Sequence, residues 1–285
     1  MTDKIIVKQS GAIARIIFNQ PEKRNAVSLE MWEAVEVALD KFAADKDVRV
    51  LILSGAGGKA FVSGADISKF ESERASADGV ARYNATTKRV YDKVEAFPKP
   101  TIAQIDGFCV GGGMALAVCC DIRICGQGSN FAIPAARLGL GYGFLGINRL
   151  ANLVGPAFTK EIFFTARRFD AEEARIMGLV NRIVEDGAVE AAADEMATTI
   201  TGNAPMTVDA VKFIANQTRK DESQRDLATC EAMVQACFDS ADYIEGRRAF
   251  MEKTQAGLDR KLTRKVQISG LFCPRNLPKK FAQEI

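Results

Sequence analysis

The chain has 285 residues, of which 47% are hydrophobic and 26% are charged, and its formal net charge at pH 7 is +2. The length allows one substantial core, and the small net charge together with the absence of any run of about 18 apolar residues argues against nucleic acid and membrane as partners. No histidine occurs, which excludes His-dependent triads and His-ligated metal sites.

The seven cysteines form no CxxC pattern, and two of them, Cys119 and Cys120, are adjacent. Such cysteines favour a reducing compartment over a disulfide framework. Residues 1–18 contain neither an apolar signal core nor an Arg- and Ser-rich leader. We therefore expect a cytoplasmic protein without a metal, in which carboxylates, Tyr, Lys, Cys or bound water act as acids and bases.

The first half of the chain alternates strand and helix patterns. The expected strands are short and apolar: 4–9 and 12–18, which are joined by a tight turn, then 48–55 and 100–107. The expected helices are 29–44, with Ser28 as its candidate N-cap, and 79–96. The two later strands are apolar almost throughout, as expected for a sheet that is covered on both faces.

Residues 114–121 are apolar on all sides, which predicts either a buried helix or the start of a strand that continues at 121–126. From residue 151 onward nearly the whole sequence has helical patterns, and no internal repeat or linker marks a second folded domain. The expected helices are 156–169, 170–178, 188–202, 204–218 and a long run over about 221–256. We therefore predict three parts: an α/β core at 1–200, a helical region at 201–253 and a tail at 254–285.

The tail has a different composition from the rest of the chain. It carries seven Lys or Arg residues and only two acidic residues. We interpret it as a peripheral extension, and the alternative is an arm that contacts a neighbouring subunit or a phosphate group.

The segment GYGFLG at 141–146 matches the dinucleotide pattern GxGxxG, and Glu161 lies near the distance expected for its acidic partner. A dinucleotide fingerprint opens the first strand-to-helix turn of a βαβ unit. Here the segment follows a loop-like stretch at 133–140, and we expect no parallel strand after it. We therefore do not interpret the chain as a nicotinamide-dependent enzyme.

Three consecutive glycines, Gly111 to Gly113, precede the apolar segment. Glycines at this place either permit close packing of a helix on a strand or expose backbone N–H groups at a helix N-terminus to an oxyanion. An oxyanion hole needs a second donor, and Gly64-Ala65-Asp66 is a candidate because it also follows a short apolar segment. Spacing alone leaves both interpretations open.

From about Ile5 to Lys253 the sequence resembles the crotonase, or enoyl-CoA hydratase/isomerase, superfamily. The resemblance rests on NQPEKRNAVS, AFVSGADISKF, KPTIAQIDGFCVGGG and FDAEEARIMGLVNRIV. It implies an α/β fold with a ββα spiral core, two roughly perpendicular sheets, and a helical C-terminal region that assembles the chain into a homotrimer or hexamer. It also implies an acyl-CoA thioester as substrate, with CoA as part of the substrate and no separate cofactor.

Carried onto this sequence, the resemblance assigns the two oxyanion-hole donors to the N–H groups of Ala65 and Gly112. Gly64 and Gly111 precede these donors and are implied to contact the substrate. Arg24 and Ala26 lie in the segment that is implied to border the CoA moiety.

The sequence departs from the hydratases of this family at both acid/base positions. In those enzymes one glutamate stands two residues after the last of the three glycines, and a second follows the Pro of the next buried segment. Here these positions are Ala115 and Ala135. Alanine exchanges no proton, so the pair of glutamates that activates water is absent.

Three segments, LGLGYGFLGINRL, TKEIFFTA and FDSADYIEGRRAF, are most similar to methylmalonyl-CoA decarboxylases. That subgroup has a pocket tyrosine at the position of Tyr142, and it normally retains an acidic residue at the place of Ala115. Tyr142 is therefore our candidate proton donor, and plain packing is the alternative.

Further polar residues are expected near the pocket. Asp66 is expected to brace the turn after the first donor, with a direct catalytic role as the alternative. Arg137 is expected either to hold a substrate carboxylate or to form a simple salt bridge, and Asn148 is a further candidate. The cysteines at 109, 119 and 120 are expected to be core residues.

We predict an acyl-CoA enzyme of the lyase or isomerase type that stabilises a thioester enolate and decarboxylates a malonyl-type CoA thioester, because loss of CO2 forms the enolate without a base. The alternative of the same class is an enoyl-CoA hydratase or isomerase with substituted acid/base groups. The alternative of another class is an acyl-CoA-binding protein with little catalysis.

Overall fold

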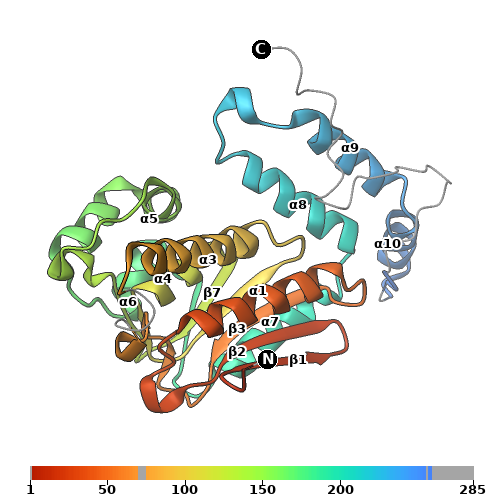
Figure 1. Cartoon of the computed structure of the whole chain (residues 1–285). Helices are drawn as coiled ribbons and strands as arrows, with labels where there is room; N and C mark the ends of the chain where they lie inside the picture. The colour runs from red at the N-terminus through yellow and green to blue at the C-terminus, as the bar shows by residue number, and fades with distance from the viewer. Residues whose placement is uncertain (1, 70–74, 255, 259–285) are drawn as a thin grey trace. The chain divides into compact units, whose positions relative to one another are not determined.

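The main sheet lies in the first of two compact units. The computed structural model describes residues 2–69, 75–254 and 256–258, and the chain divides into units 1–201 and 202–285. The strands of the main sheet are β1 Ile5–Ser10, β2 Ile13–Phe18, β3 Val50–Gly55, β5 Thr101–Ile105, β7 Ile122–Gly126 and β9 Arg182–Val184. Their order is β1-β2-β3-β5-β7-β9, with an antiparallel hairpin at β1 and β2 and parallel pairing elsewhere (Figure 1). Strands β1, β2, β3 and β5 confirm the sequence prediction, and β7 lies at 121–126, where a strand was one of the two alternatives.

The second sheet consists of short parallel strands. They are β4 Ala60–Val62, β6 Phe108–Val110 and β8 Asn130–Ala132, in the order β4-β6-β8. Each strand has three residues, which is too short for a periodic pattern, so the sequence did not predict them. Together the two sheets and their helices confirm the expected α/β fold.

The helices of the first unit largely follow the predicted pattern. Those described are α1 Leu29–Ala44, α3 Ala77–Glu95, α4 Gly112–Cys119, α5 Phe144–Thr165, α6 Ala171–Ile176 and α7 Val189–Thr201. The described 3₁₀ turns are η1 Pro21–Lys23, η2 Ile67–Lys69 and η3 Pro134–Leu138. The apolar segment after the glycines is therefore a helix. Gly155 has a φ of 77° and a ψ of 164°, which are not helical, so α5 consists of two helices that meet at a kink. The second of them starts at 156 as predicted, and the first, from Phe144, was not predicted.

Strand β9 corrects one expectation. It pairs in parallel with β7, so a parallel strand does follow the GxGxxG segment, and it lies between the expected helices 170–178 and 188–202. The strand has only three residues and none of them is fully buried, so its sequence shows no apolar alternation. The GxGxxG segment itself follows the 3₁₀ turn η3 and runs into the first turn of α5, so it does not open a strand-to-helix turn.

Both faces of the main sheet are covered by helices. Val50 and Ile52 of β3 pack in one cluster with Val189 of α7, whereas Leu51 and Leu53 lie in a larger cluster that includes residues of α1 and α4. Alternate residues of β3 therefore point to opposite faces, and both faces are buried. This arrangement explains the continuous apolar pattern of the strand, as predicted.

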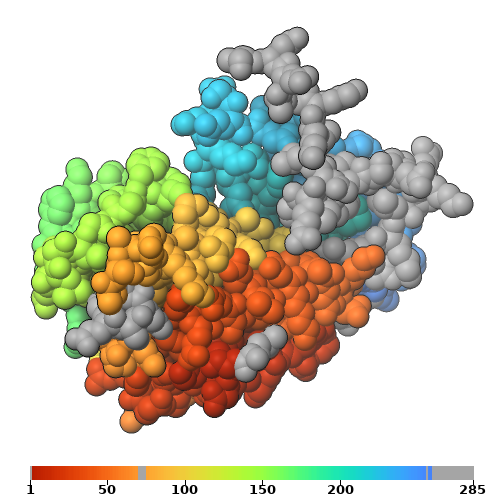
Figure 2. All heavy atoms as spheres, viewed as in Figure 1, coloured from red at the N-terminus to blue at the C-terminus, as the bar shows by residue number. Residues whose placement is uncertain are grey.

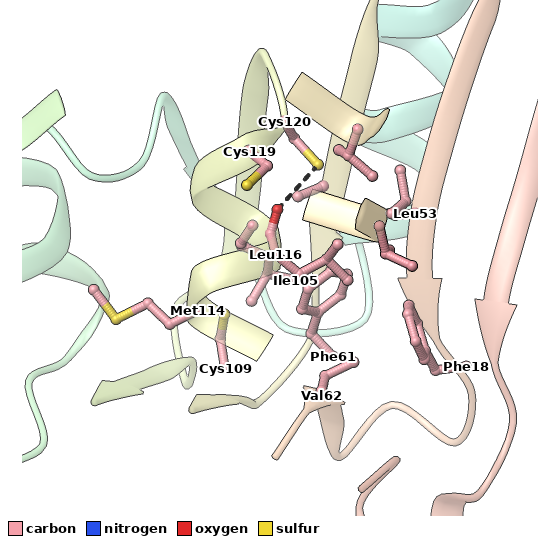
Figure 3. Close-up of a cluster of buried hydrophobic side chains, with 14 of the residues drawn as sticks. Phe18, Leu53, Phe61, Val62, Ile105, Cys109, Met114, Leu116, Cys119 and Cys120 are labelled. Carbon is pink, nitrogen blue, oxygen red and sulfur yellow. Dashed lines mark hydrogen bonds between the residues drawn. The ribbon is translucent and has the colours of Figure 1, made fainter. Parts of the chain in front are cut away.

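Helix α4 is buried on nearly all sides. Cys109 in β6 and Cys119 and Cys120 at the end of α4 lie in the larger cluster, so their interpretation as core residues is confirmed (Figure 3). Beyond the C-terminus of α4, the buried guanidinium of Arg123 donates hydrogen bonds to the backbone oxygens of Cys120 and Leu179, each at 2.6 Å. The bond to Cys120, the C-cap residue of α4, satisfies a carbonyl that the helix leaves unpaired, and a further bond to the Ala117 carbonyl at 3.3 Å helps to fix α4 at its C-terminal end.

The second unit is helical. Its described helices are α8 Pro205–Gln217, α9 Leu227–Phe238 and α10 Ala241–Glu252, with the 3₁₀ turn η4 Glu222–Gln224 before α9. The predicted long helix over 221–256 is wrong, because the chain leaves helical geometry at Asp239 and Ser240. The Ser240 hydroxyl accepts a hydrogen bond from the Tyr243 N–H at 3.1 Å and thereby caps a new helix.

The basic tail predicted at 254–285 lies outside the described residues except for residue 254 and residues 256–258, and its peripheral position stays a prediction. The domain boundaries given above also stay predictions. Over the described part of the chain, no helix has the length and apolar character to cross a membrane.

Candidate active site

The candidate site lies where the three strands of the small sheet end. β4 ends at Val62 and leads to Gly64 and Ala65, and β6 ends at Val110 and leads into the glycines. β8 ends at Ala132, which pairs with Val110, and leads to η3. Because parallel strands end at the same edge of a sheet, this register brings the two candidate donor segments and the 134–138 turn together.

Two of the three glycines are required by the local structure, for different reasons. A Cβ added to Gly113 would lie 2.1 Å from the Val62 carbonyl oxygen, which no side chain tolerates, so the packing interpretation holds for Gly113. Gly111 is required for its backbone conformation, because its φ is 56°. A Cβ on Gly111 would lie 3.9 Å from the Cα of Gly64, whose φ is 114°, so the segment before Ala65 lies against the segment before Gly112.

The backbone around Ala65 leaves one N–H group unused. The Val27 N–H donates to the Gly64 carbonyl at 2.8 Å, and the Asp66 N–H donates to the Val27 carbonyl at 3.0 Å. In this parallel bridge the N–H of the intervening residue points away from Val27. Within the described residues the Ala65 N–H has no acceptor, so it is available to a ligand.

Gly112 is the first residue of α4, and its N–H is one of the groups for which a helix supplies no acceptor. The helix dipole adds a partial positive charge at this end. The N-cap is Gly111, which has no side chain to accept from the first turn. The two N–H groups named in the sequence analysis are thus both free of intrahelical or interstrand bonds, on segments that touch.

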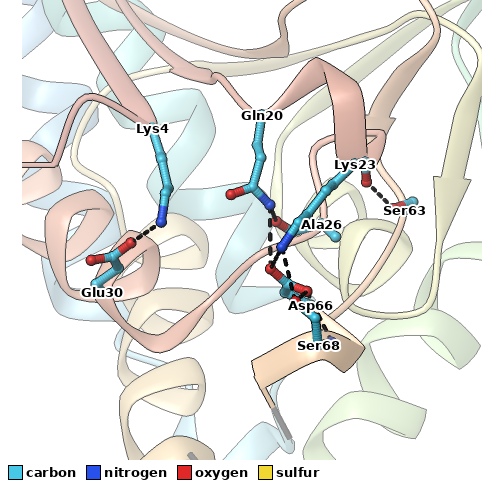
Figure 4. A network of polar contacts seen from close by, with 8 residues as sticks. All are labelled: Lys4, Gln20, Lys23, Ala26, Glu30, Ser63, Asp66 and Ser68. Carbon is cyan, nitrogen blue, oxygen red and sulfur yellow. Dashed lines mark hydrogen bonds and ion pairs between the residues drawn. The ribbon is translucent and has the colours of Figure 1, made fainter. Parts of the chain in front are cut away.

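Asp66 lies directly after Ala65, and its side chain is 5% exposed. Its carboxylate accepts hydrogen bonds from the Lys23 ammonium at 2.9 Å and from the Ser68 hydroxyl and N–H at 2.6 and 3.0 Å (Figure 4). Burial acts to raise the pKa of Asp66, but the bonds from Ser68 and Lys23 outweigh it and lower the pKa to about 2. This geometry matches the bracing role expected for Asp66.

Replacement of Asp66 with Asn is expected to remove a pH-dependent part of the stability. The folded-state pKa lies below the unfolded value, so the contribution is fully present above about pH 4 and is lost as the pH falls towards 2. We expect urea unfolding at pH 7 to show a loss of roughly 1 to 2 kcal/mol for Asp66→Asn, and a smaller loss at pH 3. Glu22→Gln, on the neighbouring turn η1, is the control, and equal losses for Asp66→Asn at both pH values would refute the assignment.

The two positions at which the family resemblance implies glutamates hold only methyl groups. Ala115 lies in α4 and is half-buried, and Ala135 lies in η3 and is 4% exposed. Both follow the ends of neighbouring strands, β6 and β8, so they flank the same edge of the small sheet as Gly112. Neither position supplies an acid or a base.

Tyr142 precedes α5 and is half-buried. Its ring packs edge-on against Phe163 with 4.9 Å between ring centroids, and burial raises the pKa of its hydroxyl above the usual value of about 10. The hydroxyl therefore stays protonated at neutral pH. The packing role of the ring is established by this contact, and a role in proton transfer stays a proposal.

The other predicted residues are spread around this edge. Arg137 is exposed on η3 and forms no ion pair with any other residue that the structure describes, so its salt-bridge alternative is not observed. Asn148 is half-buried in α5. Arg24 has a φ of 53° and stacks over the Phe108 ring at 4.8 Å, and the Ala26 carbonyl accepts a hydrogen bond from the Gln20 side chain at 3.1 Å.

Sequence reasoning missed Tyr91 of α3, whose hydroxyl donates a hydrogen bond to the Gly112 carbonyl at 3.1 Å. It also missed Arg149 of α5, whose guanidinium pairs with Asp92 at 2.6 Å and with Glu95 at 2.8 Å. No sequence signal marks either contact, because each partner lies in another helix and a tyrosine in an amphipathic helix usually packs in the core.

The comparisons with known proteins all lead to the same family. A family model described as enoyl-CoA hydratase/isomerase matches residues 8–261. The chain is 34% identical to a short-chain-enoyl-CoA hydratase of Clostridium acetobutylicum, over 88% of this chain and 95% of the relative, and 34% identical to a carnitinyl-CoA dehydratase of Citrobacter koseri, over 89% and 97%. A solved structure of an enoyl-CoA hydratase/carnithine racemase from Magnetospirillum magneticum is similar with a TM-score of 0.84 and 36% identity, and covers 92% of this chain and 97% of that one.

Proposed function

We propose a reaction for this chain from one premise: it belongs to the enoyl-CoA hydratase/isomerase family. As a family member it is an acyl-CoA enzyme. We propose that the N–H groups of Ala65 and Gly112 donate hydrogen bonds to a thioester carbonyl and stabilise the enolate that forms from it. The observation that carries this proposal is the pair of unused N–H groups on two touching segments, one of them at the positive end of α4.

The favoured reaction is decarboxylation of a malonyl-type CoA thioester. The bond between the α-carbon and the carboxylate breaks, its electron pair is delocalised onto the thioester oxygen, and CO2 leaves. One proton then adds to the α-carbon, from the Tyr142 hydroxyl or from water. This sequence of steps needs no general base, which fits a site with methyl groups at 115 and 135.

Arg137 is the proposed contact for the substrate carboxylate before it leaves as CO2. Its guanidinium is exposed and has no ion pair with the other described residues. A guanidinium binds a carboxylate through two parallel hydrogen bonds, which gives both charge and direction.

Hydration or isomerisation of an enoyl-CoA is the second candidate. The observation that favours it is similarity, since relatives at 33 and 34% identity are named crotonyl-CoA hydratase and short-chain-enoyl-CoA hydratase. This reaction needs an acid and a base, and the chain would have to supply them from positions other than 115 and 135. A weakly catalytic acyl-CoA-binding protein is the candidate from another class.

One experiment separates the three candidates. The purified protein is incubated with enoyl-, malonyl- and β-ketoacyl-CoA esters, and the products are identified by mass. Loss of 44 Da from a malonyl-type ester indicates decarboxylation, and a gain of 18 Da by an enoyl ester indicates hydration. Binding of these esters without any product would refute the enzyme proposal.

We propose that CoA enters only as part of the substrate, that no separate cofactor takes part, and that the protein works in the cytoplasm. We further propose a homotrimer or hexamer. The second unit exposes large apolar side chains, among them Phe250 and Met251 of α10, which are 81% and 80% exposed. Such side chains in a single chain indicate an interface.

Sedimentation is expected to show a species of at least three subunits at micromolar concentration, because burial of these apolar side chains favours association. A single species near the chain mass of 30.9 kDa would contradict this expectation. A chain shortened after residue 253 serves as the control for the tail. If that chain becomes monomeric, the tail is an assembly arm and not a peripheral extension.

A further inference from the structure

We propose that Tyr91 is a positioning residue for the Gly112 donor, an inference that rests on the proposed oxyanion role of that residue. The Tyr91 hydroxyl donates to the Gly112 carbonyl at 3.1 Å. It also lies 3.1 Å from the place where a Gly112 Cβ would stand. The hydroxyl therefore contacts Gly112 at its carbonyl oxygen and beside its Cα, and restricts the rotation of this residue about its backbone bonds.

The first turn of α4 packs at Gly113 against Val62 but has no side-chain N-cap. The helix has eight residues, and its N-cap is Gly111, which offers no side-chain hydrogen bond. A side-chain N-cap normally contributes about 0.5 to 2 kcal/mol to the order of a first helical turn. The C-terminal end, in contrast, is fixed by Arg123. The Tyr91 hydroxyl, which belongs to α3, restrains the first turn of α4 in place of a side-chain N-cap.

The bond is additional to the helix ladder. The Ala115 N–H donates to the Gly111 carbonyl at 3.0 Å, so the ladder of α4 starts at its first turn. The Gly112 carbonyl lies inside this ladder and has the Leu116 N–H as its helical donor. The Tyr91 hydroxyl is thus a second donor to a carbonyl whose pairing does not require it, and what it adds is a fixed orientation of Gly112.

Tyr91 is itself held by its neighbours. Its ring packs edge-on against Trp32 of α1 with 5.5 Å between centroids, and the Trp32 indole N–H donates to the Tyr83 hydroxyl at 3.1 Å. The backbone next to it is also held, because Arg149 of α5 binds Asp92, the residue after Tyr91. In the space-filling view α3 lies between α1 and the green atoms of α5 (Figure 2). Because the Tyr91 side chain is restrained in this way, its hydroxyl has a fixed position relative to Gly112.

The hydroxyl stays a neutral donor. Burial is the main cause that raises the pKa of Tyr91 well above its usual value, and the nearby Tyr142, Tyr83 and Cys119 act in the same direction, whereas Arg149 acts against them. An ionised phenol would accept and not donate, so protonation is a condition of the positioning role.

The test measures polarisation of a bound carbonyl and needs no turnover. A 2,4-dienoyl-CoA ester absorbs at longer wavelength when hydrogen bonds polarise its thioester carbonyl. Titration of the wild type, Tyr91→Phe and Thr87→Val with this probe gives both the spectral shift and the Kd. Thr87→Val is the matched control, because it removes from the same helix a hydroxyl that donates to the Tyr83 and Asn84 carbonyls of α3 itself.

We expect Tyr91→Phe to lose at least about half of the spectral shift, while its Kd for the probe changes less than about threefold. In a separate turnover assay with the preferred CoA ester, we expect its kcat to fall about 3- to 10-fold, the effect of one hydrogen bond. Thr87→Val is expected to keep the full shift. An unchanged shift in Tyr91→Phe overturns the proposal. A wild type that binds the probe without any shift overturns both this inference and the oxyanion role of Gly112, and is recognised because the wild type itself lacks the signal.

Gly112→Ala gives a second measurement that does not require Tyr91→Phe, and a double variant with Tyr91→Phe extends it. The added Cβ would displace the Tyr91 hydroxyl from a distance of 3.1 Å, so the shift is expected to fall although the Gly112 N–H remains. The double variant Gly112→Ala with Tyr91→Phe is expected to show no further fall, because both changes remove the same restraint. Additive losses in the double variant would refute the coupling.

Discussion

Gly112→Pro is expected to lower turnover of the preferred CoA ester by about 10²- to 10³-fold, the usual effect of deleting one oxyanion donor. Proline removes the N–H of Gly112 and nothing else that the helix needs. Gly112 is the first residue of α4, a position at which proline is favoured because its missing N–H has no helical acceptor. The preceding Gly111 has no Cβ, which reduces the clash that proline usually makes with the residue before it.

Gly112→Ala is the matched control for this prediction, because it adds a carbon near the Tyr91 hydroxyl but keeps the N–H. Its loss of turnover is expected to be clearly smaller than that of Gly112→Pro. Circular dichroism and thermal unfolding establish that both variants fold. A folded Gly112→Pro protein with full activity would show that this N–H has no part in the reaction.

The long strands were predictable from the sequence because a strand that is buried on both faces has a nearly continuous run of apolar residues. β3 is buried along almost its whole length, and its sequence is apolar from Val50 to Leu53. The short strands that lead to the candidate site have no such run. β4, β6 and β8 have three residues each, and their pairing joins segments that lie far apart in the chain, so no local pattern specifies them.

The donors Ala65 and Gly112 were proposed from resemblance, and their chemistry is a property of the backbone. The structure separates the roles within the glycine run, which spacing left open: Gly113 permits contact with Val62, and Gly111 permits a positive φ. Tyr91 was beyond sequence reasoning for a related reason. Its contact with Gly112 depends on how α3 packs against α4, and both the donor and the acceptor are groups that occur in any protein.

The largest gain in hydration activity is expected when glutamates replace Ala115 and Ala135. Wild-type hydration of crotonyl-CoA is expected to be very poor, because a general acid or base contributes about 10²- to 10⁴-fold and both positions are alanine. Ala115→Glu with Ala135→Glu is expected to raise hydration at least tenfold over the wild type, about one order of the contribution of such groups. The two single variants are the matched controls, and each is expected to gain less than the double variant because hydration uses an acid and a base together.

Two conditions decide how this result is interpreted. Ala135 is 4% exposed, so a glutamate there loses most of its hydration and its pKa rises, and a neighbouring carboxylate at 115 raises it further. Unfolding of the double variant must therefore be measured before its rate. Tyr142→Phe in the wild-type background is expected to depress the native reaction while CoA-ester binding is retained, since the hydroxyl is proposed to deliver a proton and not to bind CoA. Rapid hydration of crotonyl-CoA by the wild type, unaffected by Tyr142→Phe, would refute decarboxylation as the main reaction and would require a water-activating group at another position on the edge of the small sheet.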